Sequence, residues 1–473
     1  RESMIHVIRQ IERRLGHDPG EGHITIRALL LSALLLLLGA GVLFSSRASA
    51  EDFDPAREAQ KVLDTIDTGD FAAVHARFDA TMAAAISAEQ LAQGLGALAN
   101  QVGPLQSRGE PDVKTRDIGA LVTIPLRYER GELTAIFTFD NERKISGFAI
   151  RPSQATKPAV AAPAVPENAN YRETELTVGD APSALPATLA MPKGKGRFPA
   201  VVLVHGSGAQ DRDQTIGPNR PFLDIARGLA ERGIAVLRYE KRTKTYPQQF
   251  ADGGTIDLET TDDAVMAASL LRTQPGIDPK RVFVLGHSQG AMMAPRIGAR
   301  DPQIAGLILL AAPSRSLLDI LIEQNRRLSI LNDGKTSDSE NAAIQQLVDS
   351  VNAVRSGREI AAAQAPMGVP AAYWRSVDAV NPVAEAKAIA QPMLILQGAR
   401  DIQVVDADWQ GWKEAFHNSP RATFKLYETL NHLAIPGEGD GNLQEYQTPG
   451  RVAPELIADV AQWIAAQAPK RKK

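Results

Sequence analysis

Five residues, Gly286-His287-Ser288-Gln289-Gly290, constrain the fold of this chain more than any other segment. They follow the apolar run 281–285 (RVFVL) and open a stretch with helical periodicity, Gly290–Ala299. A strand that turns directly into a helix leaves room only for very small side chains two positions before and after the serine. The pattern therefore predicts a sharp strand–turn–helix corner that lifts the Ser288 hydroxyl clear of a sheet.

The segments around this corner alternate between strand and helix patterns. Strands are expected at Tyr171–Val178, Leu185–Met191, Ala200–Val204, Ile234–Arg238, Val282–Leu285, Ile304–Leu310, Met393–Leu396 and Thr423–Tyr427. Helical stretches at Arg220–Arg232, Thr260–Thr273 and Gly290–Ala299 separate the middle strands. Continuous apolar runs such as AVVLV suit parallel strands that are buried on both faces. We therefore expect a doubly wound, mostly parallel α/β sheet whose first two strands form an antiparallel edge.

The interval between Ala312 and Gln391 shows helical patterns only. Thr336-Ser337-Asp338 supplies the start signal of one helix inside it. An insertion of this length between two sheet strands predicts a helical cap over the strand ends, at about residues 313–391. The α/β domain with its cap is expected to cover residues 169–473.

Residues 51–150 have a different order of elements, which predicts a small α+β domain. Helices are expected at Pro55–Leu63, Phe71–Phe78 and Ala88–Leu98, and strands at Ala120–Glu129, Glu132–Phe139 and Lys144–Ile150. His75 is the only histidine in this domain, and we expect it on a helix surface without a chemical role. A linker is expected at residues 151–168, where four prolines stand among alanines without an apolar periodicity that could pack.

The first fifty residues resemble an export signal. Ala28–Phe44 is uncharged, Arg9, Arg13, Arg14 and Arg27 lie ahead of it, and Ala48-Ser49-Ala50 has the small-residue pattern of a cleavage site. The alternative is an uncleaved membrane anchor, because seventeen residues approach the length that spans a bilayer. In both cases the chain from Glu51 onward is expected outside the cytoplasm, in the periplasm or the medium.

Composition excludes several classes of site. The chain has no cysteine, so disulfides, thiol catalysis and cysteine-bound metals are excluded. The formal net charge is −3, with both signs spread along the chain, so nucleic acid is not an expected partner. The motifs imply neither a metal nor an organic cofactor.

A serine hydroxyl at such a corner is a poor nucleophile unless an imidazole takes its proton. In a sheet of this type the base and its acid follow the serine, in the order acid and then histidine. His432 lies just after the last expected strand, at the carboxyl edge where Ser288 is expected. His417 lies before that strand, and a structural role is expected for it.

The acid is expected after the penultimate strand. Asp401 follows Gly398, the end of PMLILQG, by three residues, and it would accept a hydrogen bond from the imidazole. Asp406 and Asp408 are the alternatives, and either could instead cap the following helix.

The segment 205–208 (HGSG) follows the strand AVVLV, where backbone amides can bind an oxyanion. We expect the Ser207 amide to act there with the Gln289 amide, with Gly208 as the alternative donor. Two charged segments, 211–213 and 238–242, lie next to the sheet ends. They are expected to form surface ion pairs that hold loops near the site, with a substrate contact as the alternative.

Residues 205–245, together with GHSQG, the GARD loop around Asp401 and the NH loop around His432, resemble a bacterial α/β-hydrolase esterase family. Some of its members carry a small extra domain ahead of the catalytic one. The resemblance spans about residues 170–467 and maps Ser288, Asp401 and His432 onto that family's catalytic triad. It implies a carboxylesterase that acts on a small-molecule ester, and the modest cap favours short acyl chains.

Two other functions stay open. A peptidase or an acyltransferase would use the same residues, and the fold does not separate these classes. A binding module with an inactive hydrolase domain is the other alternative. The complete set of Ser288, Asp401 and His432 argues against it.

Overall fold

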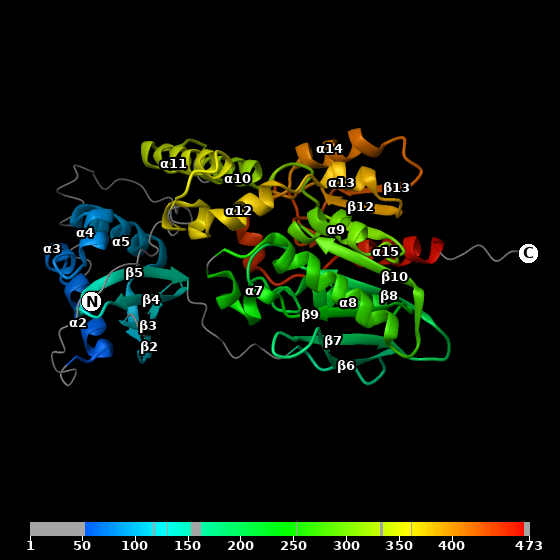
Figure 1. Cartoon of the computed structure of the whole chain (residues 1–473), viewed down its shortest axis with the longest axis horizontal. Coiled ribbons are helices and arrows are strands. Elements are labelled where there is room, and N and C mark those ends of the chain that lie inside the picture. Colours follow the sequence, from blue (N-terminus) through cyan, green and yellow to red (C-terminus); the bar gives the residue numbers. More distant parts are fainter. Residues whose placement is uncertain are drawn as a thin grey trace, which may run out of the picture. The chain divides into compact units, whose positions relative to one another are not determined.

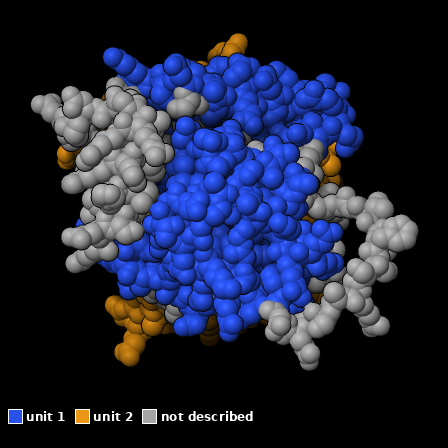
Figure 2. All heavy atoms as spheres, turned by 90° about the vertical axis from the view of Figure 1, so that its left-hand side faces the viewer, with its two compact units in different colours: residues 1–161, 325–371 blue, residues 162–324, 372–473 orange. Residues whose placement is uncertain are grey.

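The computed structural model describes residues 53–116, 119–129, 131–152, 162–251, 253–331, 334–360 and 362–467. These fall into two compact units, a first within residues 1–161 and 325–371 and a second within residues 162–324 and 372–473 (Figure 2). The export signal or anchor expected in residues 1–50 lies outside the described residues. Among the helices that are described, none combines the length and the apolar character needed to cross a bilayer.

The amino-terminal part of the first unit consists of four helices followed by an antiparallel sheet. The helices are α2 (Pro55–Asp67), α3 (Phe71–His75), α4 (Ala80–Ala85) and α5 (Ala88–Val102). The strands are β1 (Leu105–Arg108), β2 (Asp112–Arg116), β3 (Gly119–Tyr128), β4 (Gly131–Phe139) and β5 (Ile145–Pro152). Side chains of Asp54, Asp70 and Asp79 accept backbone N–H groups where α2, α3 and α4 begin. Asp is a favoured residue at this position, so the sequence starts these helices locally.

The meander of β3, β4 and β5 has the expected antiparallel order. Alternate residues of β3 and β4 are buried, among them Ile124 and Phe137, and these pack with side chains of α2 such as Val62. The sequence did not predict β1 and β2, which pair with β3. β2 exposes Lys114 and its neighbours, so it lacks the alternation by which a strand is recognised.

The second unit is built on a sheet in the order β13-β12-β11-β10-β8-β9-β7-β6 (Figure 1). Its strands are β6 (Tyr171–Val178), β7 (Leu185–Pro192), β8 (Phe198–Val204), β9 (Ala235–Tyr239), β10 (Ile277–His287), β11 (Leu307–Leu310), β12 (Met393–Gly398) and β13 (Ala422–Tyr427). The pairs from β9 to β13 are parallel. β6 and β7 form the expected antiparallel edge. The parallel strands therefore all end at one edge, which is where ligands bind in sheets of this kind.

Helices cover both faces of this sheet (Figure 1). The major ones are α6 (Pro221–Ala230), α8 (Asp262–Thr273), α9 (Gln289–Arg300), α14 (Asp406–Phe416) and α15 (Pro454–Ala466), and the short α7 (Arg242–Thr245) follows β9. On one face α6 and α15 pack against the apolar side chains of alternate strand residues. On the other face α8 and α9 contact β8, β10 and β11. A single-turn π-helix, η2 (Asp257–Thr261), precedes α8.

The expected cap segment is helical. It contains α10 (Leu317–Leu331), α11 (Asp338–Arg355), α12 (Ala371–Asp378) and α13 (Pro382–Ala388). Ser337 and Glu340 form a reciprocal capping box at the start of α11, as the start signal predicted. Residues 325–371 belong to the first unit, whereas α13 belongs to the second. A covering role of this segment over the strand ends stays a prediction.

The last residues of the expected linker, from residue 162 onward, pack on the second unit, whereas the sequence predicted no packing for them. Residues 153–161 lie outside the described residues, but the residues after them pack on the second unit. Val165 contacts a small apolar cluster that contains Tyr171 and Ala230. The Arg227 guanidinium donates to the Pro163 carbonyl at 2.6 Å. Proline and valine side chains bury apolar area without needing helical or strand periodicity, so the sequence pattern did not reveal this contact.

Candidate active site

The expected corner at Ser288 is present. Ser288 joins β10 to α9 with φ 53° and ψ −120°, a left-handed conformation that is strained for a residue with a side chain. A Cβ atom on Gly290 would lie 2.2 Å from the Val204 carbonyl oxygen, and one on Gly286 would lie 2.2 Å from the Gly290 carbonyl oxygen. Neither position can hold a larger residue, because backbone occupies the space on both sides of the serine.

His432 and Asp401 lie together on neighbouring loops at the carboxyl edge of the sheet. The distance from His432 Nδ1 to Asp401 Oδ2 is 2.7 Å, and both side chains are buried. An ionised carboxylate only accepts hydrogen bonds, so Nδ1–H of His432 is the donor and Nε2 is left to accept a proton. The other oxygen of Asp401 accepts the backbone N–H groups of Gln403 at 2.8 Å and Val404 at 3.0 Å. The carboxylate is thus held in one orientation.

The alternatives that the sequence left open have other partners. Asp406 is exposed on the first turn of α14. Asp408 is fully buried but accepts the backbone N–H of Ser314 and the Arg315 guanidinium. His417 is exposed at the end of α14. Of the three aspartates, Asp401 is the one that contacts His432.

A buried chain of hydrogen bonds connects these loops, and the sequence did not reveal it. His287, the residue before Ser288, donates from Nε2 to the His432 carbonyl at 2.7 Å. Its Nδ1 accepts from the Gln214 side-chain Nε2 at 2.7 Å, and the side-chain Oε1 of Gln214 accepts the Gly206 N–H at 3.0 Å. These hydrogen bonds connect the Ser288 corner, the His432 loop and the segment 205–208 directly. The motif admits any residue at position 287, so the sequence carried no signal for this role.

Burial sets the charge state of the two histidines around this chain. Desolvation, together with the charge that His432 can carry, lowers the pKa of His287 to about 3. Desolvation and the Lys241 ammonium lower the pKa of His205 to about 3 in the same way. A neutral His287 is important because its ring centroid lies 4.7 Å from that of His432. A charged His287 would place a positive charge directly against the His432 ring.

The segment 205–208 lies beside the serine. A Cβ atom on Gly206 would lie 3.4 Å from the Ser288 Cβ. Gly206 is buried, whereas Ser207 and Gly208 are exposed. Within the described ranges no protein acceptor is bonded to the N–H of Ser207 or Gly208. Gln289 is the first residue of α9, where an N–H has no intrahelical acceptor. These amides are therefore available to a ligand.

The two charged segments form ion pairs, as expected, but several of them are buried rather than on the surface. Arg238 Nε lies 2.8 Å from Asp213 Oδ1, and Lys241 Nζ lies 2.7 Å from Glu259 Oε1. The expectation of surface pairs was wrong, because β9 carries Arg238 into the sheet, where its side chain is 2% exposed, and Lys241, two residues after β9, is buried to the same extent. Loss of one partner would leave an uncompensated buried charge, which is far more costly than loss of a surface pair.

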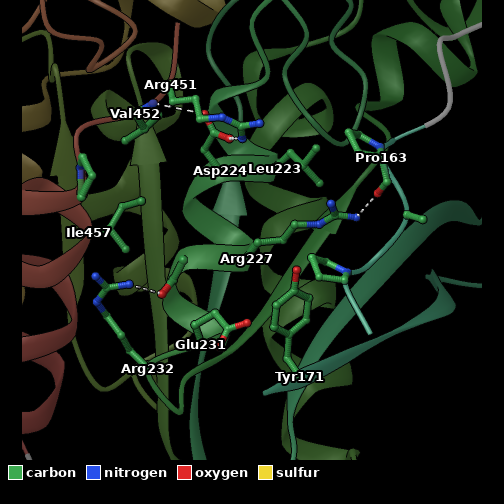
Figure 3. A pocket seen from close by; sticks show the side chains of 14 residues that line it. Pro163, Tyr171, Leu223, Asp224, Arg227, Glu231, Arg232, Arg451, Val452 and Ile457 are labelled. Carbon is green, nitrogen blue, oxygen red and sulfur yellow. Dashed lines mark hydrogen bonds and ion pairs between the residues drawn. The ribbon is translucent and has the colours of Figure 1, made fainter. Parts of the chain in front are cut away.

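A separate apolar cavity of about 440 Å³ lies elsewhere on the second unit (Figure 3). Its lining includes Pro163 and Tyr171 from the amino-terminal side, Leu223 and Arg227 from α6, and Ile457 from α15. Ser288, Asp401 and His432 are not among its lining residues. We therefore do not assign the chemistry to it. Among the described residues no cluster of three His, Asp or Glu side chains could hold a metal ion.

The buried histidines predict a pH dependence of stability. Between the ordinary value of 6.5 and a folded pKa of about 3, the unfolded chain binds more protons than the folded one. The free energy of unfolding should therefore fall as the pH drops below 6.5, by about 1.4 kcal/mol per pH unit for each histidine. His205→Gln should reduce this slope in denaturant titrations at pH 7, 6 and 5. His417→Gln, at an exposed position, is the control, and an equal effect of both substitutions would contradict the prediction.

Comparisons with known proteins agree with this architecture. The family model described as serine aminopeptidase, S33, matches residues 199–440. A family of proteins of unknown function, DUF3887, matches residues 59–148. The esterase EstD of Thermotoga maritima is 36% identical over 342 residues, which cover 72% of this chain and 78% of that protein.

Solved structures with a similar chain path include Est1E from Butyrivibrio proteoclasticus, at 17% identity and a TM-score of 0.41, covering 62% of this chain and 98% of that one. An esterase of Pyrococcus furiosus has 15% identity and a TM-score of 0.41, covering 66% of this chain and 96% of that one. The assignment rests on the family model and on the relative from Thermotoga. The chain belongs to the α/β-hydrolase family and is a relative of a bacterial esterase, and a segment that matches DUF3887 precedes its own hydrolase sheet.

Proposed function

We propose that this α/β hydrolase cleaves carboxylic esters through an acyl-enzyme on Ser288, with His432 as the base and Asp401 as its partner. The observation that carries the proposal is the 2.7 Å bond between His432 and Asp401. The same His432 loop is bonded at 2.7 Å to His287, the residue next to Ser288. The relationship to the esterase EstD supports an ester as the substrate.

The proposed reaction has two halves. Ser288 Oγ attacks the ester carbonyl while His432 Nε2 takes the hydroxyl proton of the serine. The oxyanion that forms accepts hydrogen bonds from the backbone N–H groups of Ser207 and Gln289. Collapse of this intermediate expels the alcohol, which receives the proton from His432. A water molecule, deprotonated by His432, then attacks the acyl-enzyme and releases the acid.

Asp401 stabilises the imidazolium that exists between these steps. Its carboxylate faces His432 Nδ1 with one oxygen and two backbone N–H groups with the other. Charge-assisted hydrogen bonds of this kind are stronger than neutral ones and hold the carboxylate in place. The arrangement also selects the tautomer of His432 whose Nε2 accepts the serine proton.

The second candidate is a peptidase, because the matching family model is described as a serine aminopeptidase. An acyltransferase would share the same first half-reaction. Amides need protonation of a poorer leaving group, so the classes separate on paired substrates. Turnover rates measured side by side on an ester, the matching anilide and an aminoacyl anilide distinguish ester hydrolysis from peptidase activity.

The triad makes the first functional prediction. Ser288→Ala should abolish labelling by a fluorophosphonate and reduce ester turnover by a factor of about 10³ or more, because the nucleophile is lost. Asp401→Asn should retain labelling at a greatly reduced rate. Asp406→Asn, an exposed neighbour on the same segment, is the control and should behave as wild type. A folded Ser288→Ala variant with wild-type turnover would refute the assignment, and an unlabelled wild type would favour a binding module.

We also propose a preference for short acyl chains. The proposed cap is of modest size, and the described part of its helices carries no long exposed apolar stripe of the kind that binds lipid interfaces. The kcat/KM for p-nitrophenyl esters should peak at short chains, about two to six carbons, and decline toward long ones. A rate that rises steadily with chain length and increases with emulsions would contradict this preference.

Export is proposed from the sequence of the first fifty residues, with the hydrolase outside the cytoplasm. The basic flank, the apolar segment Ala28–Phe44 and the small residues before Glu51 support it. Fractionation of cells that express the chain from its natural start should place activity outside the cytoplasm. A mature chain beginning at Glu51 would indicate cleavage, an intact chain in membranes would indicate an anchor, and activity confined to the cytosol would contradict export.

A further inference from the structure

A single buried ion pair touches both segments that supply the proposed oxyanion amides. The Lys241 side chain is 2% exposed, and its ammonium donates to the Gly206 carbonyl and to Glu259, each at 2.7 Å. The other oxygen of Glu259 accepts the Gln289 side-chain amide at 3.1 Å and also the Tyr373 hydroxyl. The pair therefore connects the segment 205–208 with the first residue after Ser288.

The geometry of the peptide bond gives the Lys241 contact a consequence for Ser207. The Gly206 carbonyl and the Ser207 N–H belong to one planar trans peptide, so they point in opposite directions. An ammonium that holds the carbonyl on the buried side directs the N–H toward the other side. The positive charge also draws electron density toward the carbonyl oxygen, which strengthens the N–H as a donor.

The remaining contacts fix the same two segments from other sides. Gly206 donates its own N–H to Gln214, so both of its peptide groups are held. The Gln289 side chain is held by Glu259 and by the Tyr373 hydroxyl at 3.3 Å. Burial and the Glu259 carboxylate raise the pKa of Tyr373, which keeps its hydroxyl protonated as a donor. Glu259 itself lies in η2, a π-helical turn of a type that often occurs at functional sites.

We propose that Lys241 and Glu259 are positioning residues that set and polarise the oxyanion hole. This inference rests on the proposed function. Stability alone explains the pair poorly, because a buried ion pair costs desolvation and can often be replaced by apolar groups without loss. The Lys241 cation instead lies against the carbonyl of the Gly206–Ser207 peptide, and the Glu259 carboxylate that neutralises it also binds the Gln289 side chain. Both therefore act next to the place where negative charge develops in the transition state.

The test is the double variant Lys241→Met with Glu259→Gln, which removes the charges without leaving either one unpaired. Steady-state kinetics are measured on a small oxygen ester and on the matching thiono ester, whose sulfur accepts hydrogen bonds weakly. We expect kcat on the oxygen ester to fall about 10- to 100-fold with little change in KM, since removal of one oxyanion donor costs about 10²–10³. The preference for the oxygen ester should fall by about the same factor, because the intrinsic difference in reactivity between the two esters is the same for both enzymes and only the oxyanion contact changes.

A matched control is the ion pair between Arg272, near the end of α8, and Asp301, just after α9. It lies at the far end of α9 from Ser288 and is largely buried. Arg272→Met with Asp301→Asn should lower the melting temperature to a comparable extent while leaving the oxygen-to-thiono ratio as in wild type. If both double variants lower the ratio equally, the effect is a general loss of packing and the proposal fails.

Two further outcomes separate this inference from the proposed function. A folded Lys241/Glu259 variant with wild-type kcat and ratio overturns the positioning role even where Ser288 is labelled normally. A wild type that fluorophosphonate does not label overturns the proposed function itself. Should the double variant not fold, Lys241→Gln with Glu259→Gln keeps neutral hydrogen-bonding groups at both positions, and a smaller fall in the same ratio is then expected. An unchanged ratio in that variant overturns the proposal as well.

Discussion

The left-handed backbone at Ser288 is the constraint on which the rest of the second unit depends. A residue with φ 53° at the end of a buried strand is strained, and it persists only where its surroundings leave no alternative. Here the start of α9 lies against β8 so closely that Gly290 has no room for a Cβ atom beside the Val204 carbonyl. The close approach brings the serine beside Gly206, and the parallel order of the sheet brings the loops of Asp401 and His432 to the same edge.

Buried polar groups around this corner connect segments that are far apart in the chain. Gly206 donates to Gln214 and accepts from Lys241, while His287 links Gln214 to His432. Such a network is costly unless each member has a partner, and fully paired it specifies one arrangement of the loops. The buried ionisable groups avoid an unpaired charge in two different ways. His287 stays neutral through burial, whereas the charge of Lys241 is compensated by Glu259.

Much of this arrangement was predictable because it follows local patterns. The glycines around Ser288, the apolar runs of the parallel strands and the capping residues of α11 each report a backbone conformation within a few residues. The order of acid and histidine after the serine selected Asp401 and His432 as candidates, and the structure joins them by a hydrogen bond. β2 and the packing of Val165 were not predictable, because exposed strands and irregular segments have no periodicity to read.

The sequence by itself determined the corner at Ser288 and the alternation of strands and helices that makes a parallel sheet. Both depend on steric limits and hydrophobic patterns among residues that are near one another in the chain. Only the tertiary structure showed which of Asp401, Asp406 and Asp408 contacts His432, because the contact depends on which carboxylate reaches an imidazole about thirty residues later in the chain. It also decided the partners of Lys241 and His287. Hydrogen bonds and ion pairs act over a few ångströms of space, and no spacing along the chain encodes which distant groups will meet.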